Sequence, residues 1–426
     1  RPVRQNKERL MLVKFKKVLT WMRDLWLIIG ITVAYILLIE IVLSIAFHYR
    51  DASSNDSRIS ADTYQNADWP KKYYKEFNES YNSEWVSYVY WRREPYKGQY
   101  INIDSQGIRK TWSSNIGEGD KSIHPKIFMF GGSAMWGTGS RDDFTIPSIF
   151  SKRLAKYGVN AQTVNFGESG YVSTQEVIML IRELQKMNIP DLVIFYDGVN
   201  DTYSAYQQQI AGIPQNEFNR VKDFNSSKRI ATTDLWSSFA NNLSTIQFVK
   251  AVFRRLGTGS PSDNAAQHNT KHSLSKSSAN NGALANDVLN IYEKNIEIVE
   301  YLAKRYSFKA LFYWQPTIFE KQYRTKYEEE KRQRYLEMQL FFDMTYGLLR
   351  QRDFSKDGEI EFHDLSMLFS NVSEPLFVDW AHLGETGNSY IAERLVLDTI
   401  SIMGGRLSAE QRAAPDRLST PLQGDR

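Results

Sequence analysis

The chain of 426 residues contains no cysteine. Disulfide bonds and thiolate metal sites are therefore excluded, although every cellular compartment remains open. No His-Glu-x-x-His segment is present, which excludes a zinc hydrolase of that type, and we expect no metal and no cofactor. No internal repeat is visible. Histidine is scarce, with six in the whole chain, so few side chains are candidates for a catalytic base.

Most of the chain also lacks an excess of positive charge. The formal net charge is +4, but residues 1–24 alone carry eight basic and two acidic side chains, a net of +6. The difference leaves the other residues near −2. A nucleic-acid-binding domain carries a basic surface, and the residues after the first 24 have no excess of basic side chains to form one. We therefore expect no nucleic-acid partner.

One long apolar run follows the basic arm. Residues 25–47 contain a single charged side chain, Glu40. At ~1.5 Å per residue such a helix spans the roughly 30 Å of a bilayer core. The run is too long for the apolar part of a signal peptide, and no small-residue cleavage pattern follows it. The sequence predicts a transmembrane helix over residues 25–48.

The charge around this helix predicts its orientation. The basic arm, residues 1–24, is expected in the cytoplasm, which places the rest of the chain on the periplasmic side of the inner membrane. A carboxylate is costly inside lipid, so Glu40 is a candidate contact for a partner membrane protein. The chain begins at Arg1, not at methionine, and we expect the natural start to lie upstream.

Amino-acid composition divides the chain after residue 48 into segments. Residues 49–84 are polar and are expected to form a stem, and residues 85–406 are expected to form the main domain. Within this domain, residues 257–287 are rich in Ser, Asn, Gly and Ala and predict a flexible insertion. Residues 407–426 are expected to be a disordered tail. The domain starts with a dense aromatic flank, residues 85–100, which we expect to pack against the core, with stacking on sugar rings as the alternative.

Strand-like and helix-like runs alternate through the main domain, which predicts a parallel sheet covered on both faces. Ligands of such sheets bind beyond the carboxyl ends of the strands. The expected strands are Lys126 to Phe130, Thr163 to Phe166, Leu192 to Tyr196, Lys309 to Trp314 and Ile360 to Leu365.

Polar or glycine-bearing turns follow these strands. "FGGSAMWGTG" contains Ser133, "NFGESG" contains Gly167, "GVND" contains Asn200, and "DWAH" contains Asp379 and His382. A serine hydroxyl needs a nearby base to become a nucleophile, and His382 is the candidate. His124 and His363 remain as alternatives that are more typical of structural positions.

The same residues complete a possible catalytic site. Asp379 would orient the imidazole of His382. The oxygen of an attacked ester becomes negative and needs fixed donors. The backbone N–H groups of Ser133 and Gly167 and the amide of Asn200 are the candidates.

The order and spacing of these blocks resemble the SGNH hydrolases, also called the GDSL esterases. The resemblance extends from residue 126 to about residue 403. It implies a flavodoxin-like three-layer α/β/α sandwich with about five parallel strands, and an oxyanion hole and a catalytic triad made of the residues above. Gly132 stands where this family usually has aspartate, a change that removes none of the catalytic groups. An α/β-hydrolase fits less well, because Met135 breaks the Gly-x-Ser-x-Gly pattern.

Three functions follow from the resemblance. The first is a membrane-anchored esterase that removes acyl groups, O-acetyl among them, from an extracytoplasmic carbohydrate. The second is an O-acyltransferase that modifies an exported polysaccharide through the same acyl-serine intermediate. The third is a non-catalytic sugar-binding or assembly protein, which the complete set of catalytic residues argues against. The sequence does not separate the first two.

Overall fold

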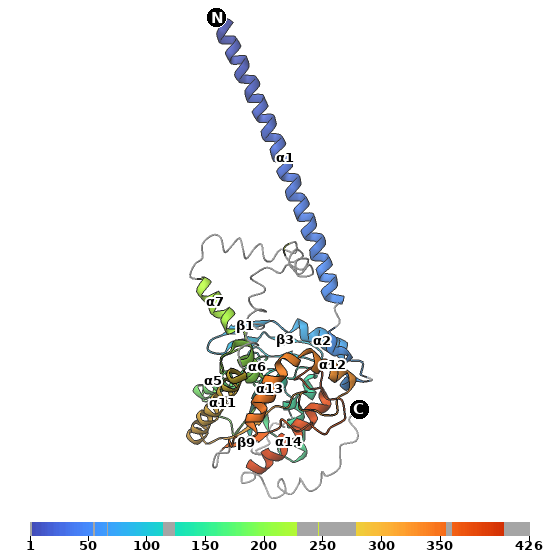
Figure 1. Cartoon of the computed structure of the whole chain (residues 1–426), viewed down its shortest axis with the longest axis vertical. Helices are drawn as coiled ribbons and strands as arrows, with labels where there is room; N and C mark the ends of the chain where they lie inside the picture. Colours follow the sequence, from blue (N-terminus) through green and yellow to red (C-terminus); the bar gives the residue numbers. More distant parts are fainter. Residues whose placement is uncertain are drawn as a thin grey trace, which may run out of the picture. The chain divides into compact units, whose positions relative to one another are not determined.

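The computed structural model describes residues 2–53, 56–65, 67–113, 124–227, 246, 278–354 and 360–403 (Figure 1). The chain divides into two units: residues 1–55 with 223–275, and residues 56–222 with 276–426. The predicted insertion up to residue 277 and the predicted tail lie outside the described residues.

The first unit contains one long helix, α1 (Pro2–Ser53). Its segment Lys14–Ile45 is long and apolar enough to cross a membrane, and none of it is buried within the protein. The helix extends beyond the predicted residues 25–48 at both ends, because the basic arm before the apolar run also has good helix formers and no proline after Pro2 to end it. The prediction that Glu40 contacts a partner protein stays a prediction.

The second unit is built on a five-stranded sheet with the order β6-β5-β7-β8-β9, and all neighbours are parallel. This order confirms the predicted flavodoxin-like architecture. All five strands lie within one residue of the predicted bounds. They are β5 (Lys126–Gly131), β6 (Gln162–Asn165), β7 (Leu192–Asp197), β8 (Lys309–Trp314) and β9 (Ile360–Asp364).

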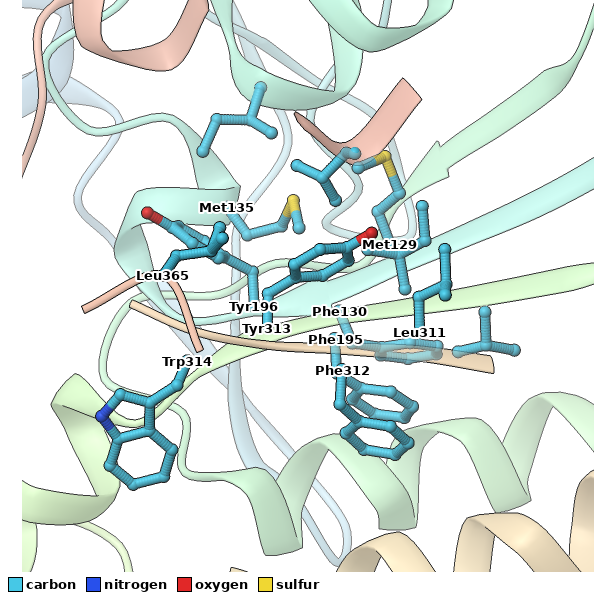
Figure 2. Packing of buried hydrophobic residues seen from close by; sticks show 14 of the residues in the cluster. Met129, Phe130, Met135, Phe195, Tyr196, Leu311, Phe312, Tyr313, Trp314 and Leu365 are labelled. Atoms are coloured by element: carbon cyan, nitrogen blue, oxygen red, sulfur yellow. The ribbon is translucent and has the colours of Figure 1, made fainter. Parts of the chain in front are cut away.

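Side chains alternate between the two faces of the sheet (Figure 2). Phe130, Phe195 and Phe312 are paired in register and stack on one face, with ring centroids 5.2 and 4.6 Å apart. Tyr196 and Tyr313 point to the opposite face. Because both faces are apolar, both need a helical layer, which is the reason for the three-layer sandwich.

Helices cover the two faces in separate groups. α4 (Ile146–Lys156) packs against α14 (Glu385–Met403) on one face. On the other face, α11 contacts three further helices. α11 is Ser278–Tyr306, and the three helices that it contacts are α5 (Ser173–Gln185), α6 (Val199–Gln208) and α13 (Leu336–Leu349). The helices α7 (Glu217–Ser227) and α12 (Lys326–Arg334) follow α6 and β8 along the chain.

Two predicted boundaries need correction. The first turns of α11 occupy residues 278–287, where Leu284 and Ala285 are buried, so the predicted insertion includes the start of a core helix. The predicted stem, residues 49–84, contains the end of α1 but from residue 56 onward belongs to the second unit. Both segments are mainly polar in composition, so the sequence predicts that they lie outside the core. A few well-spaced apolar side chains are nevertheless enough to attach each of them to it.

The part of the predicted stem that belongs to the second unit, from residue 56 onward, is called the former stem, and it packs through aromatic side chains. Its elements are η1 (Ser57–Ser60), η2 (Asp62–Tyr64) and α2 (Pro70–Glu79). Tyr73 and Phe77 of α2 are buried in a cluster that includes Trp136, which follows the predicted catalytic serine. The Tyr64 hydroxyl donates to the Gly139 carbonyl oxygen at 2.6 Å. This segment therefore supports the turn after β5.

The aromatic flank forms two short hairpins, β1 (Ser83–Val86) with β2 (Tyr90–Arg93), and β3 (Tyr96–Lys97) with β4 (Asn102–Ile103). The flank is only partly packed as predicted. Val89 is fully buried, whereas Trp85 and Tyr88 are 67% and 77% exposed.

Candidate active site

Ser133 is the first residue of the short helix α3 (Ser133–Trp136), directly after β5. Two residues before Ser133, the chain passes close to β7 and requires a glycine. A Cβ atom at Gly131 would lie 2.7 Å from the Tyr196 carbonyl oxygen. The N–H groups of a first helical turn have no partner within the helix. The hydroxyl and N–H of Ser133 are thus both held at the carboxyl edge of the sheet.

Ser133, His382 and Asp379 form a continuous chain of polar contacts. The Ser133 Oγ and His382 Nε2 atoms are 2.6 Å apart. His382 Nδ1 lies 2.8 Å from Asp379 Oδ2 and 2.9 Å from Oδ1. The backbone N–H of His382 also donates to Asp379 Oδ1, at 2.9 Å, so the turn fixes the carboxylate against the ring. This geometry allows the imidazole to accept the hydroxyl proton while the carboxylate stabilises the resulting cation.

Asp379 is held in its charged form. Burial by itself raises the pKa of this carboxyl, but the charge and hydrogen bond of His382 and the charge of Arg58 outweigh burial, and the pKa lies below its usual range. The Arg58 Nη1 atom is 3.9 Å from Asp379 Oδ2. An ionised carboxylate is the form that orients and stabilises an imidazolium.

Arg58 is a site residue that the sequence did not reveal. Its Nη2 atom donates to Asp56 Oδ2 at 2.7 Å, and its guanidinium lies over the rings of Tyr74 and Phe77. Arg58 therefore stands between the carboxylates of Asp56 and Asp379. No local sequence signal marks such a role, because the contact to Asp379 depends on how the former stem packs.

Asn200 lies at the start of α6, and its side chain reaches toward the turn that carries Ser133. Its Nδ2 atom donates to the Tyr171 carbonyl oxygen at 2.8 Å, and an amide nitrogen has a second proton to give. A Cβ atom at residue 132 would lie 2.1 Å from Asn200 Nδ2. Gly132 thus provides the space that this amide occupies.

The position of Gly167 does not agree with its predicted role as an oxyanion donor. Its N–H donates to Asn165 Oδ1 at 2.9 Å, and Gly167 does not line the pocket around Ser133. Gly170, the second glycine of "NFGESG", does line this pocket. Among the described residues its N–H donates to no protein acceptor. The motif contained both glycines, and only the course of the loop distinguishes them.

The loop that contains Gly170 is fixed by β2. The Arg93 N–H donates to Glu168 Oε2 at 3.0 Å, and both side chains are buried. The Arg93 Nη2 atom donates to Ser169 Oγ at 3.0 Å, and Trp91 Nε1 donates to the Ser169 carbonyl oxygen at 2.9 Å. The hairpin thus holds the loop in place beside Ser133.

A pocket of about 550 Å³ opens at Ser133 and His382. Its wall combines aromatic rings with amide and guanidinium groups. Besides the two catalytic candidates, this wall includes Arg58, Phe77, Tyr81, Ser83, Trp91, Arg93, Asn200, Tyr203, Gln215, Arg220, Tyr335 and Trp380. Such a surface suits a ligand with flat apolar faces and hydroxyl groups at its edge.

The two alternative histidines, His124 and His363, lie elsewhere. His124 Nδ1 is 2.9 Å from the Asn160 carbonyl oxygen, and His363 stacks on Tyr313. Neither lines the pocket. Within the described residues, no group of three or more His, Asp and Glu side chains has the arrangement of a metal site.

Residues 127–395 match the GDSL-like lipase/acylhydrolase family, so the chain belongs to this family and is an ester hydrolase. No curated protein matches the sequence. Solved structures with a similar fold include the acetyl xylan esterase AlAXEase, with 15% identity over 65% of this chain and 100% of that chain and a TM-score of 0.34. A G-D-S-L family lipolytic protein from Veillonella parvula has 11% identity over 65% and 98% of the two chains and a TM-score of 0.34. Values this low say nothing about the substrate of this chain.

Proposed function

We propose that the protein is a membrane-anchored serine esterase that hydrolyses acyl esters, O-acetyl among them, on an extracytoplasmic carbohydrate. The observation that carries this proposal is the chain of contacts from Ser133 Oγ through the His382 ring to Asp379. The family gives the reaction class, and this chain of contacts supports a nucleophile, a base and an orienting carboxylate for it.

In the proposed reaction, Ser133 Oγ attacks the ester carbonyl carbon and His382 Nε2 takes the hydroxyl proton. The carbonyl oxygen becomes negative and is stabilised by the Ser133 N–H and the free Asn200 Nδ2 proton. We assign the third donor to the Gly170 N–H in place of Gly167. His382 then protonates the departing sugar oxygen, and the acyl group remains on Ser133.

Deacylation repeats these steps with water. His382 removes a proton from a water molecule, which attacks the acyl carbon, and the proton returns to Ser133 Oγ as the carboxylic acid leaves. A sugar hydroxyl in the place of water would instead yield acyl transfer.

The carbohydrate assignment is supported by the pocket. Its rings, among them Trp91 and Trp380, offer apolar faces, while Gln215 and Arg220 offer hydrogen-bonding groups. A pyranose ring has the matching combination of C–H faces and equatorial hydroxyl groups. The anchor is supported by the apolar segment Lys14–Ile45, and its charge bias favours a cytoplasmic N-terminus.

The proposal is tested by labelling the full-length protein with a fluorophosphonate and locating the adduct by mass spectrometry. We expect the label on Ser133, and release of acetate from acetylated sugars by the unlabelled protein. Ser133→Ala should remove both, with turnover reduced about 10⁴- to 10⁶-fold. An adduct on another residue would disprove the assignment of the nucleophile. Acetate that appears on an added sugar acceptor, and not in solution, would favour the transferase.

A further inference from the structure

The hairpin of β1 and β2 extends one wall of the active-site pocket into solvent. In its register Ser83 pairs with Arg93 and Trp85 pairs with Trp91. Paired residues, and residues two apart on one strand, share a face of a hairpin. Ser83, Trp91 and Arg93 line the pocket, so the face that they share continues beyond the pocket to Trp85.

The aromatic rings of this hairpin form a row. The ring centroids of Trp85 and Tyr90 are 5.2 Å apart, and those of Tyr90 and Trp91 are 6.3 Å apart and nearly parallel. The guanidinium of Arg220 lies 4.5 Å from the Trp91 ring centre, and the Tyr90 hydroxyl donates to Glu217 Oε1 at 3.0 Å. The row thus begins in the pocket, has polar groups beside it and ends in solvent at Trp85.

The backbone of this hairpin is strained. Tyr88 has a φ of 72° and Tyr90 a φ of 74°, values in the left-handed region that large side chains seldom adopt. Such conformations persist only where the surroundings enforce them, and they concentrate at functional positions. A loop without a function for its rings would more readily have glycine or asparagine here.

The surroundings supply this constraint. The Val89 side chain is fully buried, and Gln175 Nε2 donates to the Val89 carbonyl oxygen at 2.8 Å. The Arg182 guanidinium donates to the Ser87 carbonyl oxygen, and the Tyr171 hydroxyl to the Trp91 carbonyl oxygen. The hairpin is therefore held at its turn, through Ser87 and Val89, and along β2, through Trp91, so its exposed rings are presented on a fixed backbone.

We propose that this hairpin binds the sugar residues that flank the esterified one, so that the substrate is a polymeric chain and not a single acylated sugar. This inference rests on the proposed esterase function. Rigid aromatic rings suit sugar faces, since they provide apolar contact area without losing side-chain freedom on binding. Exposed Trp and Tyr also occur at membrane surfaces, but here the row starts inside the pocket, which ties it to the substrate.

The test compares substrates of different length on the full-length protein in detergent. Probes are p-nitrophenyl acetate and chemically acetylated gluco-oligosaccharides of one to six sugars. We expect KM of the wild type to fall with length and kcat to change little. Trp85→Ala should raise KM for the longest probe about two- to tenfold, the scale of one aromatic contact, and leave p-nitrophenyl acetate unchanged.

Four further proteins complete the experiment. Trp85→Phe keeps a ring and should restore most of the length dependence. Tyr301→Ala removes an equally exposed ring from α11 and should change nothing. Ser133→Ala, titrated with the acetylated hexamer by calorimetry, should bind it more tightly than the same protein with Trp85→Ala added, which tests the hairpin without catalysis.

The outcomes separate the two proposals. Absence of any hydrolysis by the wild type would refute the esterase function and this inference with it. Hydrolysis that does not depend on length, or an equal effect of Trp85→Ala on the shortest and longest probes, would overturn the hairpin proposal alone. An effect of Trp85→Ala seen only in lipid nanodiscs and not in detergent would assign the hairpin to the membrane surface instead.

Discussion

Gly132 shows how one residue defines the space around Asn200, a proposed oxyanion donor. The family usually has aspartate at this position, yet a Cβ atom here would lie 2.1 Å from Asn200 Nδ2. The φ of Gly132 is −76°, outside the left-handed region that favours glycine, and the closest contact of an added Cβ atom is with the Asn200 side chain, so a substitution acts through space. In this chain the Asn200 amide occupies the space that a side chain at position 132 would need.

We therefore expect Gly132→Ala to lower kcat by displacing the Asn200 amide. The loss should approach that of Asn200→Ala, about 10²- to 10³-fold, the effect of one oxyanion donor. The measurement is kcat on p-nitrophenyl acetate. Gly347→Ala is the matched control, because it adds a methyl group where no atom lies within 4 Å. Full activity of Asn200→Ala would remove this residue from the oxyanion hole.

The contacts of Arg58 predict how the thermal stability of the protein depends on pH. Arg58 helps to hold the pKa values of Asp56 and Asp379 below their usual range. A carboxyl group whose pKa is lower in the folded than in the unfolded protein stabilises the fold at pH values above its unfolded-state pKa of about 4. This contribution is lost as the pH falls through the pKa of the folded state. Arg58→Gln should thus lower Tm at pH 6, and its deficit relative to the wild type should shrink toward pH 3.

Thermal unfolding of both proteins at the two pH values checks this prediction. Arg58→Lys keeps a positive charge and should recover part of the loss at pH 6, although it cannot form the two-pronged contact to Asp56. A deficit that is independent of pH would show that Arg58 acts only through its packing on Tyr74 and Phe77.

At the scale of elements, a buried carboxyl pair joins β7 to α5. Burial raises the pKa of Asp197 to about 8, and it also raises the pKa of its neighbour Glu176. The Tyr292 hydroxyl of α11 lies 3.4 Å from Asp197 Oδ2. The neutral form of Asp197 is the one that the fold accommodates.

A raised pKa stabilises the fold at low pH, and this contribution declines as the pH rises from about 4, the unfolded value, to about 8. Asp197→Asn cannot ionise. Its Tm relative to the wild type should therefore increase between pH 5 and pH 9. A constant difference over this interval would mean that Asp197 is already ionised in the folded protein at pH 5.

The start of α11 gives a second prediction at this scale. Deletion of residues 257–277 with a short linker should change Tm little, because their composition offers few apolar groups to a core. Deletion of residues 257–287 should lower Tm by several degrees, because it also removes the buried Leu284. Equal Tm values for the two deletions would mean that the first turns of α11 contribute nothing to the core.

At the scale of the whole molecule, the charge around α1 predicts which compartment the esterase faces. Alkaline phosphatase fused after residue 406 should be active, since the basic arm favours a cytoplasmic N-terminus and export of the remainder. A reporter that requires the cytoplasm, fused at the same junction, should be inactive. The reverse pair of results would place the catalytic unit inside the cell and exclude an extracytoplasmic substrate.

The sequence by itself determined the sheet and most of the catalytic candidates. Strands such as Leu192–Asp197 are short, apolar and bounded by glycine or polar turns, and buried parallel strands have this pattern whatever surrounds them. Residues that follow parallel strands reach the same edge of the sheet, so the sequence predicts that Ser133 and Asn200 lie close together. The chemistry of a serine nucleophile predicts His382 as base and Asp379 as its orienting residue, and the family resemblance implies the same roles.

Tertiary structure alone decided which groups complete the site. Gly167 and Gly170 are equivalent in composition, and only the hydrogen bond from the Gly167 N–H to Asn165 assigns them different surroundings. Arg58 lies in a segment whose local pattern predicts a stem, but it reaches the pocket and approaches Asp379, which is far away along the chain. Local sequence encodes backbone preference and burial, whereas the direction of an N–H group or a charge depends on packing between segments that are far apart along the chain.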